Sequence, residues 1–567
     1  MTDTGAVEDA VRAALKEMGV EQTEVHLERP RDPTHGDLAT NVAMTLASTL
    51  RRPPREIALE LARRIPVDGG TITAVEVAGP GFLNFRLSAA SLGSQLIDAL
   101  VQGAAFGRSQ EGKGEAMLVE FVSANPTGPL HLGHGRQAAL GDAISSLLEW
   151  TGWKVHREFY YNDAGRQMER LGESVWARYQ QALGGDTPVP EDGYQGEYVG
   201  EVAQTLLQEW GDRYRDDTPP EVLDRMRLAA AALLRNDQDR DLTRFRVHFN
   251  QYFLESSLYD EGKVDETIRL LDATGLVYRE GGAVWLRTTE FGDQKDRVMV
   301  KGDGSPTYFL PDVAYHRTKW ERGFQHVVNI QGADHHGTVT RVRAGLQALG
   351  LPAGYPEYVL HQMVTVERGG EEVKLSKRAG SYTTLHDLMD EVGVDVARYF
   401  FLMRKAEAHL VFDLDQALDQ SEKNPVFKVQ YAHARICSIF RKAGVQLEEL
   451  DAAAAELDLL THESERNLVQ EIGEFPQVVA RAAAARAPHV VCEYLERTAG
   501  LVNSWYHAGN PARAPELAVL HSDPRFRTAR LVLAGAARTV LANGLGLLGV
   551  HAPERMEREE HSHQEES

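Results

Sequence analysis

The middle of the chain alternates short apolar runs with helix-like segments, and this alternation restricts the fold more than any other feature. Between Met117 and about residue 400, the runs include "MLVEFV", "KVHREFYY", "HVVNI" and "YVLHQMVTV". Strands that alternate with helices are typical of βαβ units and a parallel sheet. We therefore predict an α/β domain over residues 113–400, in which arginine-rich helical sequence near 201–270 forms an insertion.

The two flanking regions have different patterns. Residues 1–112 combine an amphipathic helical segment with the strand-like sequence "AVEVAGPGFLNFRLS", which predicts a small α+β domain. Residues 401–556 are rich in alanine, leucine and arginine at helical spacing, which predicts an all-α helical bundle. Residues 557–567 are charged and poor in apolar side chains, so we expect a disordered acidic tail.

Composition excludes several classes of protein. A net charge of −22 over 567 residues argues against a protein that coats DNA or RNA indiscriminately, although it permits a local basic face. The apolar runs are shorter than the roughly 18 residues that span a bilayer, and the acidic N-terminus does not resemble a signal peptide. We expect a cytoplasmic protein with no membrane partner. Its two cysteines, Cys437 and Cys492, are predicted to be buried free thiols.

The sequence "VSANPTGPLHLGHGRQAALGDA" follows the first strand of the central region. Ligands of parallel sheets bind where strand ends meet helix N-termini, and helix N-termini favour phosphate. His131 and His134 can lie on one helical face and donate hydrogen bonds to phosphoryl oxygens, while Gly133 and Gly135 permit close approach. A glycine-rich turn with two solvated histidines is the alternative. A metal pair lacks a third ligand, so we predict no metal site.

A second stretch, "GGEEVKLSKRAGSY", places Lys374 and Lys377 around Leu375 and Ser376. A glycine-flanked loop with two ammonium groups can close over the β- and γ-phosphates of a nucleotide. A solvated basic loop is the alternative interpretation. Together with the two histidines, the loop would give a site for a nucleoside triphosphate.

These two stretches resemble the two hallmark motifs of class I aminoacyl-tRNA synthetases. Within that class, "TYFLPDVAYH", "GADHHG" and "NPVFKVQYAHARICS" are similar to the bacterial type of the arginyl-tRNA synthetase family, and the resemblance extends from about Gly36 to Met556. Arg378 stands where the second motif has its last serine. The resemblance implies a Rossmann-like catalytic domain, an N-terminal tRNA-contacting domain and an α-helical anticodon-binding domain in a monomer.

The activity implied is ATP-dependent ligation of L-arginine to its cognate tRNA through an arginyl-adenylate, with ATP and Mg²⁺. The arginine carboxylate attacks the α-phosphorus and pyrophosphate leaves, so no protein nucleophile is needed and positioning carries the catalysis. A cofactor adenylyltransferase, a synthetase-derived binding protein without catalysis, and a class I enzyme for lysine or another amino acid are the alternatives.

The resemblance also implies roles for individual residues, each of which has an ordinary surface or capping role as its alternative. A guanidinium is a planar fork of donors that needs carboxylates and coplanar acceptors. Besides the histidines, lysines, Ser376 and the two glycines of the first motif, Gly332 and Asp334 are implied for ATP. The residues expected around arginine are Asn125, Tyr308, Asp312, Glu120, Glu255 and Gln331.

Two segments are candidates for binding tRNA. In the helix predicted to begin at Asn424 and Pro425, a cationic stripe lies beside an aromatic ring, which suits phosphates and an unpaired base. Its residues are Lys428, Tyr431, Arg435 and Lys442. A solvated helix face is the alternative. In the strand "GFLNFRLS", Phe82 and Asn84 share one face, where an exposed aromatic ring and an amide could contact the tRNA D-loop.

Overall fold

A five-stranded parallel sheet lies at the centre of the molecule, as the alternating pattern predicts. The strand order is β11-β10-β4-β5-β6, and all four neighbouring pairs are parallel. Since β4 comes first in the sequence, the chain winds outward through β5 and β6 and then returns to the other side of β4. Its strands are β4 (Ala116–Glu120), β5 (Lys154–Tyr161), β6 (Gln251–Leu254), β10 (His326–Gly332) and β11 (Glu357–His361).

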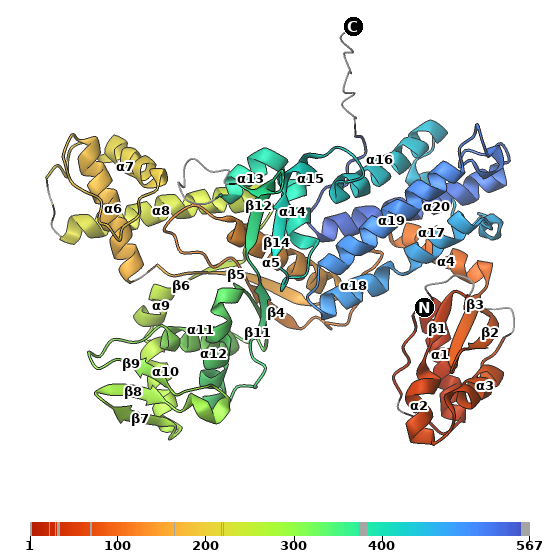
Figure 1. Ribbon diagram of the computed structural model, residues 1–567, viewed down its shortest axis with the longest axis horizontal. Helices are drawn as coiled ribbons and strands as arrows, with labels where there is room; N and C mark the ends of the chain where they lie inside the picture. Colours follow the sequence, from red (N-terminus) through yellow and green to blue (C-terminus); the bar gives the residue numbers. More distant parts are fainter. Residues whose placement is uncertain are drawn as a thin grey trace, which may run out of the picture.

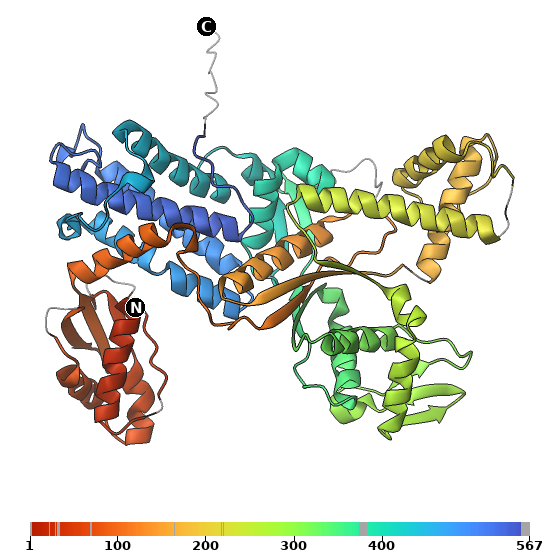
Figure 2. The same cartoon turned by 180° about the vertical axis from the view of Figure 1, so that it is seen from behind.

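The computed structural model describes residues 3–21, 23–28, 30, 35–67, 71–163, 165–216, 218, 220–373 and 383–556. The molecule is elongated, and both views place the N-terminal domain and helices α6–α8 at opposite ends (Figures 1 and 2). No helix in these described ranges is both long and apolar enough to cross a lipid bilayer. The predicted tail, residues 557–567, lies outside the described residues.

The N-terminal region is an α+β unit, as predicted. Its antiparallel sheet has the order β1-β3-β2, and the helices pack their apolar residues against it. The last helix of the region, α4, packs against α17 and α20 of the C-terminal bundle. The elements are α1 (Asp3–Glu17), β1 (Leu38–Thr40), α2 (Val42–Leu50), α3 (Pro54–Arg64), β2 (Ile72–Ala78), β3 (Phe82–Leu87) and α4 (Ala89–Gln102).

The connections of the central sheet carry two additional units. Three helices between β5 and β6 form a separate core, and a three-stranded antiparallel sheet lies between α10 and α11. The helices are α5 (Leu132–Trp150), α6 (Arg166–Ala182), α7 (Glu197–Trp210), α8 (Pro220–Arg244), α9 (Glu255–Asp260), α10 (Lys263–Ala273), α11 (Phe309–Glu321) and α12 (His336–Ala348). The antiparallel strands are β7 (Val277–Glu280), β8 (Ala283–Leu286) and β9 (Arg297–Val300).

Two elements bear on the predicted domain limits, which stay predictions. The helices between β5 and β6 begin at residue 166, whereas residues 251–254 already belong to the central sheet. The limit expected at residue 400 falls inside α14, and β14 beyond it pairs with β12 in a small sheet. The elements here are β12 (Val364–Arg368), β13 (Glu371–Glu372), α13 (Leu385–Val392), α14 (Val394–Leu402), β14 (Leu410–Asp413) and α15 (Leu414–Leu418).

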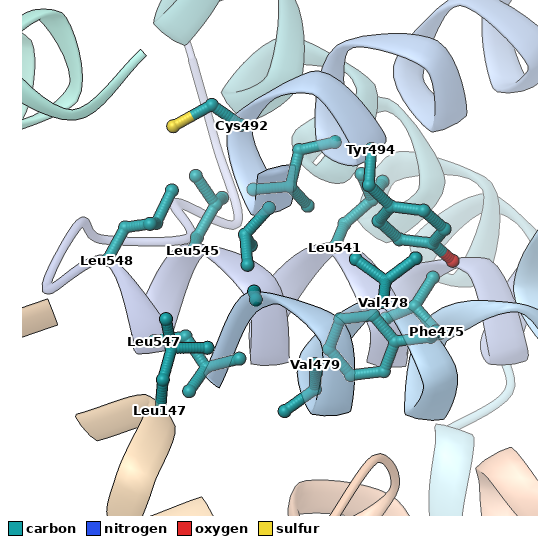
Figure 3. Packing of buried hydrophobic residues seen from close by; sticks show 14 of the residues in the cluster. Leu147, Phe475, Val478, Val479, Cys492, Tyr494, Leu541, Leu545, Leu547 and Leu548 are labelled. Atoms are coloured by element: carbon teal, nitrogen blue, oxygen red, sulfur yellow. The ribbon is translucent and has the colours of Figure 1, made fainter. Parts of the chain in front are cut away.

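The C-terminal region is a helical bundle, and one apolar core joins it to the central domain. The far end of α5 packs against α18 and α20, and Leu147 belongs to an apolar cluster with side chains of α18, α19 and α20 (Figure 3). Both cysteines are buried free thiols in this region, as predicted. The helices are α16 (Pro425–Ala443), α17 (Glu463–Gly473), α18 (Phe475–Ala484), α19 (His489–Ala508) and α20 (Pro524–Leu547).

Arg398 fastens three parts of the molecule together. This fully buried side chain donates to Asp142 Oδ2 of α5 at 2.6 Å, to the Phe245 carbonyl after α8 at 2.7 Å, and to the Leu548 carbonyl after α20 at 3.0 Å. A buried guanidinium is stable only when its donors are satisfied and a carboxylate balances its charge. The helix that carries the two histidines is therefore fixed to the bundle by a polar contact as well as by apolar packing.

Candidate functional site

The two predicted histidines lie together at the first turn of α5. His131 is the N-cap residue, and its Nδ1 accepts from the His134 backbone N–H at 3.3 Å. The His134 Nδ1 accepts from the His131 backbone N–H at 3.3 Å, so the two residues form a reciprocal capping box. Their rings stack with centroids 3.6 Å apart. A histidine takes the place of the serine or threonine that is usual at an N-cap, and the capping hydrogen bonds fix both rings.

The capping contacts determine how the two imidazoles are protonated. Burial lowers the pKa of His131 and holds the pKa of His134 well below its ordinary value, so both rings are neutral near pH 7. A neutral imidazole carries one N–H, and here each Nδ1 is an acceptor. The proton therefore lies on each Nε2, which leaves two N–H donors at the positive end of a helix.

A cavity of about 1030 Å³ opens at the carboxyl ends of the parallel strands. Its walls come from the ends of β4, β5, β10 and β11, from the start of α9, and from the first turn of α5. β4 is the strand at which the chain reverses its direction of winding, and such a switch point is where open α/β sheets bind ligands. The sheet topology therefore positions the histidines in this cavity at the carboxyl ends of the strands.

The lysine loop itself lies outside the described residues, which end at Val373 and resume at Thr383. Both of these flanking residues line the cavity together with His131 and His134. The Leu385 N–H also donates to the Leu130 carbonyl at 2.8 Å, directly before His131. The structure therefore gives no position for Lys374, Ser376 or Lys377, but both ends of their segment meet the histidine site.

Acidic side chains are concentrated in another part of the same cavity. Glu255, at the start of α9, accepts from the Tyr160 hydroxyl at 2.8 Å, and Asp312 lies on α11. Burial raises the pKa of both carboxyl groups, that of Asp312 to about 7, while the Arg341 charge opposes the shift of Asp312. Neighbouring carboxylates without a paired cation are costly to ionise, so this end of the cavity favours a cationic ligand.

The other residues expected around arginine also line this cavity. Tyr308 is 73% exposed at the start of α11, at the mouth of the acidic end. Asn125 lines the cavity from the loop after β4, and its amide donates to Gln167 Oε1 at 2.5 Å. Gln331 lies on β10, where its buried Oε1 has no hydrogen-bond partner within the part of the chain that the structure describes. The cavity thus brings together side chains that are about 200 residues apart in the sequence.

Glu120 lies in the cavity wall but is already paired. Its carboxylate accepts from Lys319 Nζ at 2.5 Å and from the Ser123 hydroxyl at 3.0 Å. Lys319 is fully buried and also donates to Asn329 Oδ1 at 3.1 Å. Because this carboxylate is neutralised within the protein, it holds the end of β4 in place more than it offers a free charge.

The three glycines expected near ATP do not share one role. Gly133 and Gly332 are among the residues that line the cavity and Gly135 is not, so its role with ATP stays a prediction. A Cβ on Gly135 would lie 2.8 Å from Leu385 Cδ1 and 3.1 Å from the Phe401 ring, so close helix packing requires this glycine. Asp334 lines the cavity with a side chain that is 77% exposed. Gly133 leaves room for the His131 ring, which a Cβ would approach within 2.9 Å.

Several lining residues were missed in the sequence. His361 ends β11, and burial lowers its pKa to about 4. Its Nε2 is buried without a hydrogen-bond partner among the described residues, as is the Tyr358 hydroxyl. Buried polar atoms without partners are rare and indicate a bound ligand or water. Both residues sit at the carboxyl end of a parallel strand, so the strand-end rule that found Gly332 was sufficient to find them. Among the described residues, no group of histidine, cysteine and carboxylate side chains is arranged to hold a metal ion.

Comparisons with known proteins agree with this site. The family described as "tRNA synthetases class I (R), catalytic domain" matches residues 95–423, "Arginyl tRNA synthetase N terminal domain" matches residues 5–87, and "DALR anticodon binding domain" matches residues 429–556. The chain belongs to the arginyl-tRNA synthetase family.

Individual relatives resemble the chain over nearly its whole length. It is 52% identical to an arginine–tRNA ligase of Bordetella pertussis, covering 97% of this chain and 98% of the relative, and 49% identical to one of Thiobacillus denitrificans, covering 96% and 98%. The solved structure of Thermus thermophilus arginyl-tRNA synthetase is 26% identical and superimposes with a TM-score of 0.76 over 97% of this chain and 99% of that one. The resemblance noted in the sequence is confirmed.

In this arginyl-tRNA synthetase family member, the two N-terminal candidates for contact with tRNA, Phe82 and Asn84, do not form an open surface. Asn84 is buried, with 6% of its surface exposed, whereas Phe82 is partly exposed at the start of β3. β3 is the central strand of its sheet, and Asn84 lies between Ala39 of β1 and Glu76 of β2. The expectation of an exposed amide at Asn84 is therefore wrong. Contact with tRNA at either residue stays a prediction.

The cationic stripe on α16 is only partly open. Arg435 lies between the rings of Tyr431 and Tyr506, at 4.7 and 4.8 Å from their centroids, and donates to Asn503 Oδ1. Lys428 points toward Gly500 on α19, whereas Lys442 is exposed. The stripe faces α19, so internal contacts use part of its charge. The expectation of a continuous solvent-facing stripe is corrected, and its role with tRNA stays a prediction.

Proposed function

We propose that this chain ligates L-arginine to its cognate tRNA by way of an arginyl-adenylate, releasing pyrophosphate and AMP. One observation carries the proposal: a single cavity has neutral imidazole donors at a helix N-terminus in one part and a pair of unneutralised carboxyl groups in another. The first part suits a triphosphate and the second suits a guanidinium. A ligand pair of ATP and arginine complements both ends.

At the phosphate end, the Nε2–H groups of His131 and His134 would donate to oxygens of the α- and β-phosphates. Such donors stabilise charge that develops as the α-phosphorus is attacked, and their fixed rings need little reorganisation. Lys374 and Lys377 would bind the departing pyrophosphate, and Ser376, Gly332, Gly133 and Asp334 would complete the nucleotide site. Mg²⁺ would enter as the ion of MgATP, held mainly by phosphate oxygens and water, which requires no cluster of protein ligands.

At the acidic end, Asp312 and Glu255 would accept from the guanidinium and Tyr308 would cover it. A bound cation would favour the ionised form of both carboxyl groups, because a nearby positive charge lowers the pKa of a carboxyl group. Asn125 and Gln331 would hold the α-amino group, whose N–H donors match the unpartnered Gln331 Oε1. Fixed at both ends, the arginine carboxylate is directed at the α-phosphorus between them.

The reaction then needs no group from the protein to form a covalent bond. The arginine carboxylate attacks the α-phosphorus, the bond to the bridging oxygen of pyrophosphate breaks, and a ribose hydroxyl of the tRNA 3′ end later takes the arginyl group from AMP. Contacts of α16 and the N-terminal domain with tRNA, a monomeric state and a cytoplasmic location complete the proposal.

Pyrophosphate exchange measured against each of the twenty amino acids, with and without total tRNA, tests the proposal. We expect exchange with arginine, MgATP and tRNA present, and transfer of arginine to tRNA in the same mixture. Exchange that occurs with lysine and not with arginine would identify lysine as the substrate in place of arginine. Nucleotidyl transfer to a small cofactor without amino acid, or arginine binding without any exchange, would favour the alternative classes and overturn the proposal.

A further inference from the structure

The loop between β4 and α5 has a backbone conformation that its own residues do not favour. Val122 and Ser123 have φ angles of 68° and 41°, a region that side chains with a Cβ rarely adopt. Such residues cost about 1–3 kcal/mol each and persist where surrounding contacts fix them. The loop continues through Asn125, which lines the cavity, to the capping residue His131. Contacts that fix this loop therefore also fix the site.

The residues of the loop that follow Ser123 are held by the helical insertion α6–α8, and each of its helices supplies at least one hydrogen bond. Gln167 of α6 accepts from the Asn125 amide at 2.5 Å, and the Tyr198 hydroxyl of α7 donates to the Thr127 carbonyl at 2.9 Å. Gln238 of α8 donates from Nε2 to the carbonyls of Asn125 and Gly128, at 3.0 and 2.8 Å. The three helices therefore hold Asn125, Thr127 and Gly128 of the same loop by hydrogen bonds.

Gln238 makes the most demanding of these contacts. It is 1% exposed, and its Oε1 accepts from the Tyr161 hydroxyl at 3.4 Å. Both acceptors of its Nε2 are backbone carbonyls, so this position requires a neutral group with two N–H donors. An apolar replacement would remove the donor that both partly buried carbonyls share, and an ionised carboxylate would repel them.

The insertion is a body with its own core. Apolar side chains of all three helices pack together, including Leu171 of α6, Val199 of α7 and Met226 of α8, all of them fully buried. A packed unit resists deformation, so it presents the side chains that grip the loop in a fixed arrangement. The insertion is therefore a rigid element that contacts the loop, although none of its residues takes part in the chemical step of the proposed reaction.

We propose that Gln238 is a positioning residue for arginine activation, and that the α6–α8 insertion holds Asn125 and the His131 cap in register through it. The inference rests on the proposed function. Misplacement of a binding group by about 1 Å can lower a rate about 100-fold, even when the altered residue never touches substrate. In the proposed arrangement Asn125, in this loop, holds the amino group of arginine, so we expect the arginine step to depend on the loop most.

Gln238→Leu is the direct test, because leucine is similar in size and removes both donors. In the full-length protein with tRNA, we expect kcat/KM for arginine in pyrophosphate exchange to fall about 10- to 100-fold while the KM for ATP changes less than about twofold. Gln180→Leu is the matched control. Gln180 is also buried in the insertion and bonds to the backbone at Tyr214 and Asp216, but it does not touch the loop.

Gln238→Glu adds a readout that loss of stability does not produce. Burial raises the pKa of such a carboxyl, and its protonated form donates one O–H to a carbonyl whereas its ionised form donates none. The activity of Gln238→Glu relative to the unaltered protein should therefore rise at least about threefold between pH 8 and pH 6. Gln238→Leu should show no such recovery.

The outcomes separate this inference from the proposed function. Absence of arginine-dependent exchange in the unaltered protein would refute the proposed function. Normal exchange in that protein, together with equal arginine kinetics in Gln238→Leu and Gln180→Leu, would overturn the inference. If Gln238→Leu does not fold, Tyr198→Phe removes the neighbouring grip on Thr127, and we expect a several-fold loss in kcat/KM for arginine. An unchanged value in that variant would also overturn the inference.

Discussion

Helices α5 and α16 are both 19 residues long, and both have a side-chain N-cap. The sequence predicts that both bind a ligand. They differ in what surrounds the chosen residues. The histidines of α5 line a cavity, and their contacts with each other use the Nδ1 atom of each ring. The cations of α16 face another helix, where Arg435 is held by two tyrosine rings. A helix terminus projects functional groups away from the helix, whereas a helix side is a packing surface.

The largest expected effect separates capping from chemistry at α5. Asparagine is among the best N-cap residues, so His131→Asn keeps the acceptor for the His134 N–H and removes the Nε2–H donor. We expect kcat for pyrophosphate exchange to fall about 100- to 1000-fold, with an unfolding midpoint close to that of the unaltered protein. Asn424→Ala is the matched control at α16: it removes two capping bonds and a third, buried bond to the Ala417 carbonyl, lowers stability by about 1–3 kcal/mol and leaves exchange intact.

The next effect concerns the acidic end of the cavity. The Asp312 carboxyl has a pKa of about 7 in the free protein because it is buried, so arginine must displace its proton at lower pH. The KM for arginine should therefore fall up to about tenfold as pH rises from 6 to 8, while the KM for ATP stays nearly constant. Asp312→Asn should raise the arginine KM and flatten this dependence. An equal slope in Asp312→Asn would assign the proton to another group.

The smallest effects divide the stripe of α16 into a packed part and an open part. Arg435→Ala removes a guanidinium between two aromatic rings and should lower the free energy of unfolding by about 1–3 kcal/mol. Lys442→Ala removes an exposed charge, so stability should change by less than about 0.5 kcal/mol while the KM for tRNA rises two- to threefold. Denaturation midpoints and aminoacylation kinetics measure both. Equal losses of stability in Arg435→Ala and Lys442→Ala would contradict the division of the stripe into a packed part and an open part.

The sequence was sufficient for the fold class because the relevant signals are local. Strand–helix alternation, an N-cap and a first-turn proline depend on neighbouring residues, and the structure has β4, β5, α5 and α16 where these signals predict them. Expectations based on which face is open were weaker. Asn84 alternates correctly along β3 but is covered in the centre of the sheet, and Gly135 serves packing against Phe401.

By itself, the sequence determined which residue types carry the chemistry: paired histidines before a helix, carboxylates for a guanidinium, and a family resemblance over almost the whole chain. Only the tertiary structure decided which of them share a cavity, which charges are already neutralised, and which distant helices hold the loop. Residue type and spacing fix what a side chain can do within one element. The burial and pKa of Asp312 and the pairing of Glu120 with Lys319 depend on distant elements, which in the case of Glu120 and Lys319 are about 200 residues apart. These contacts form only when the central sheet and its helices assemble.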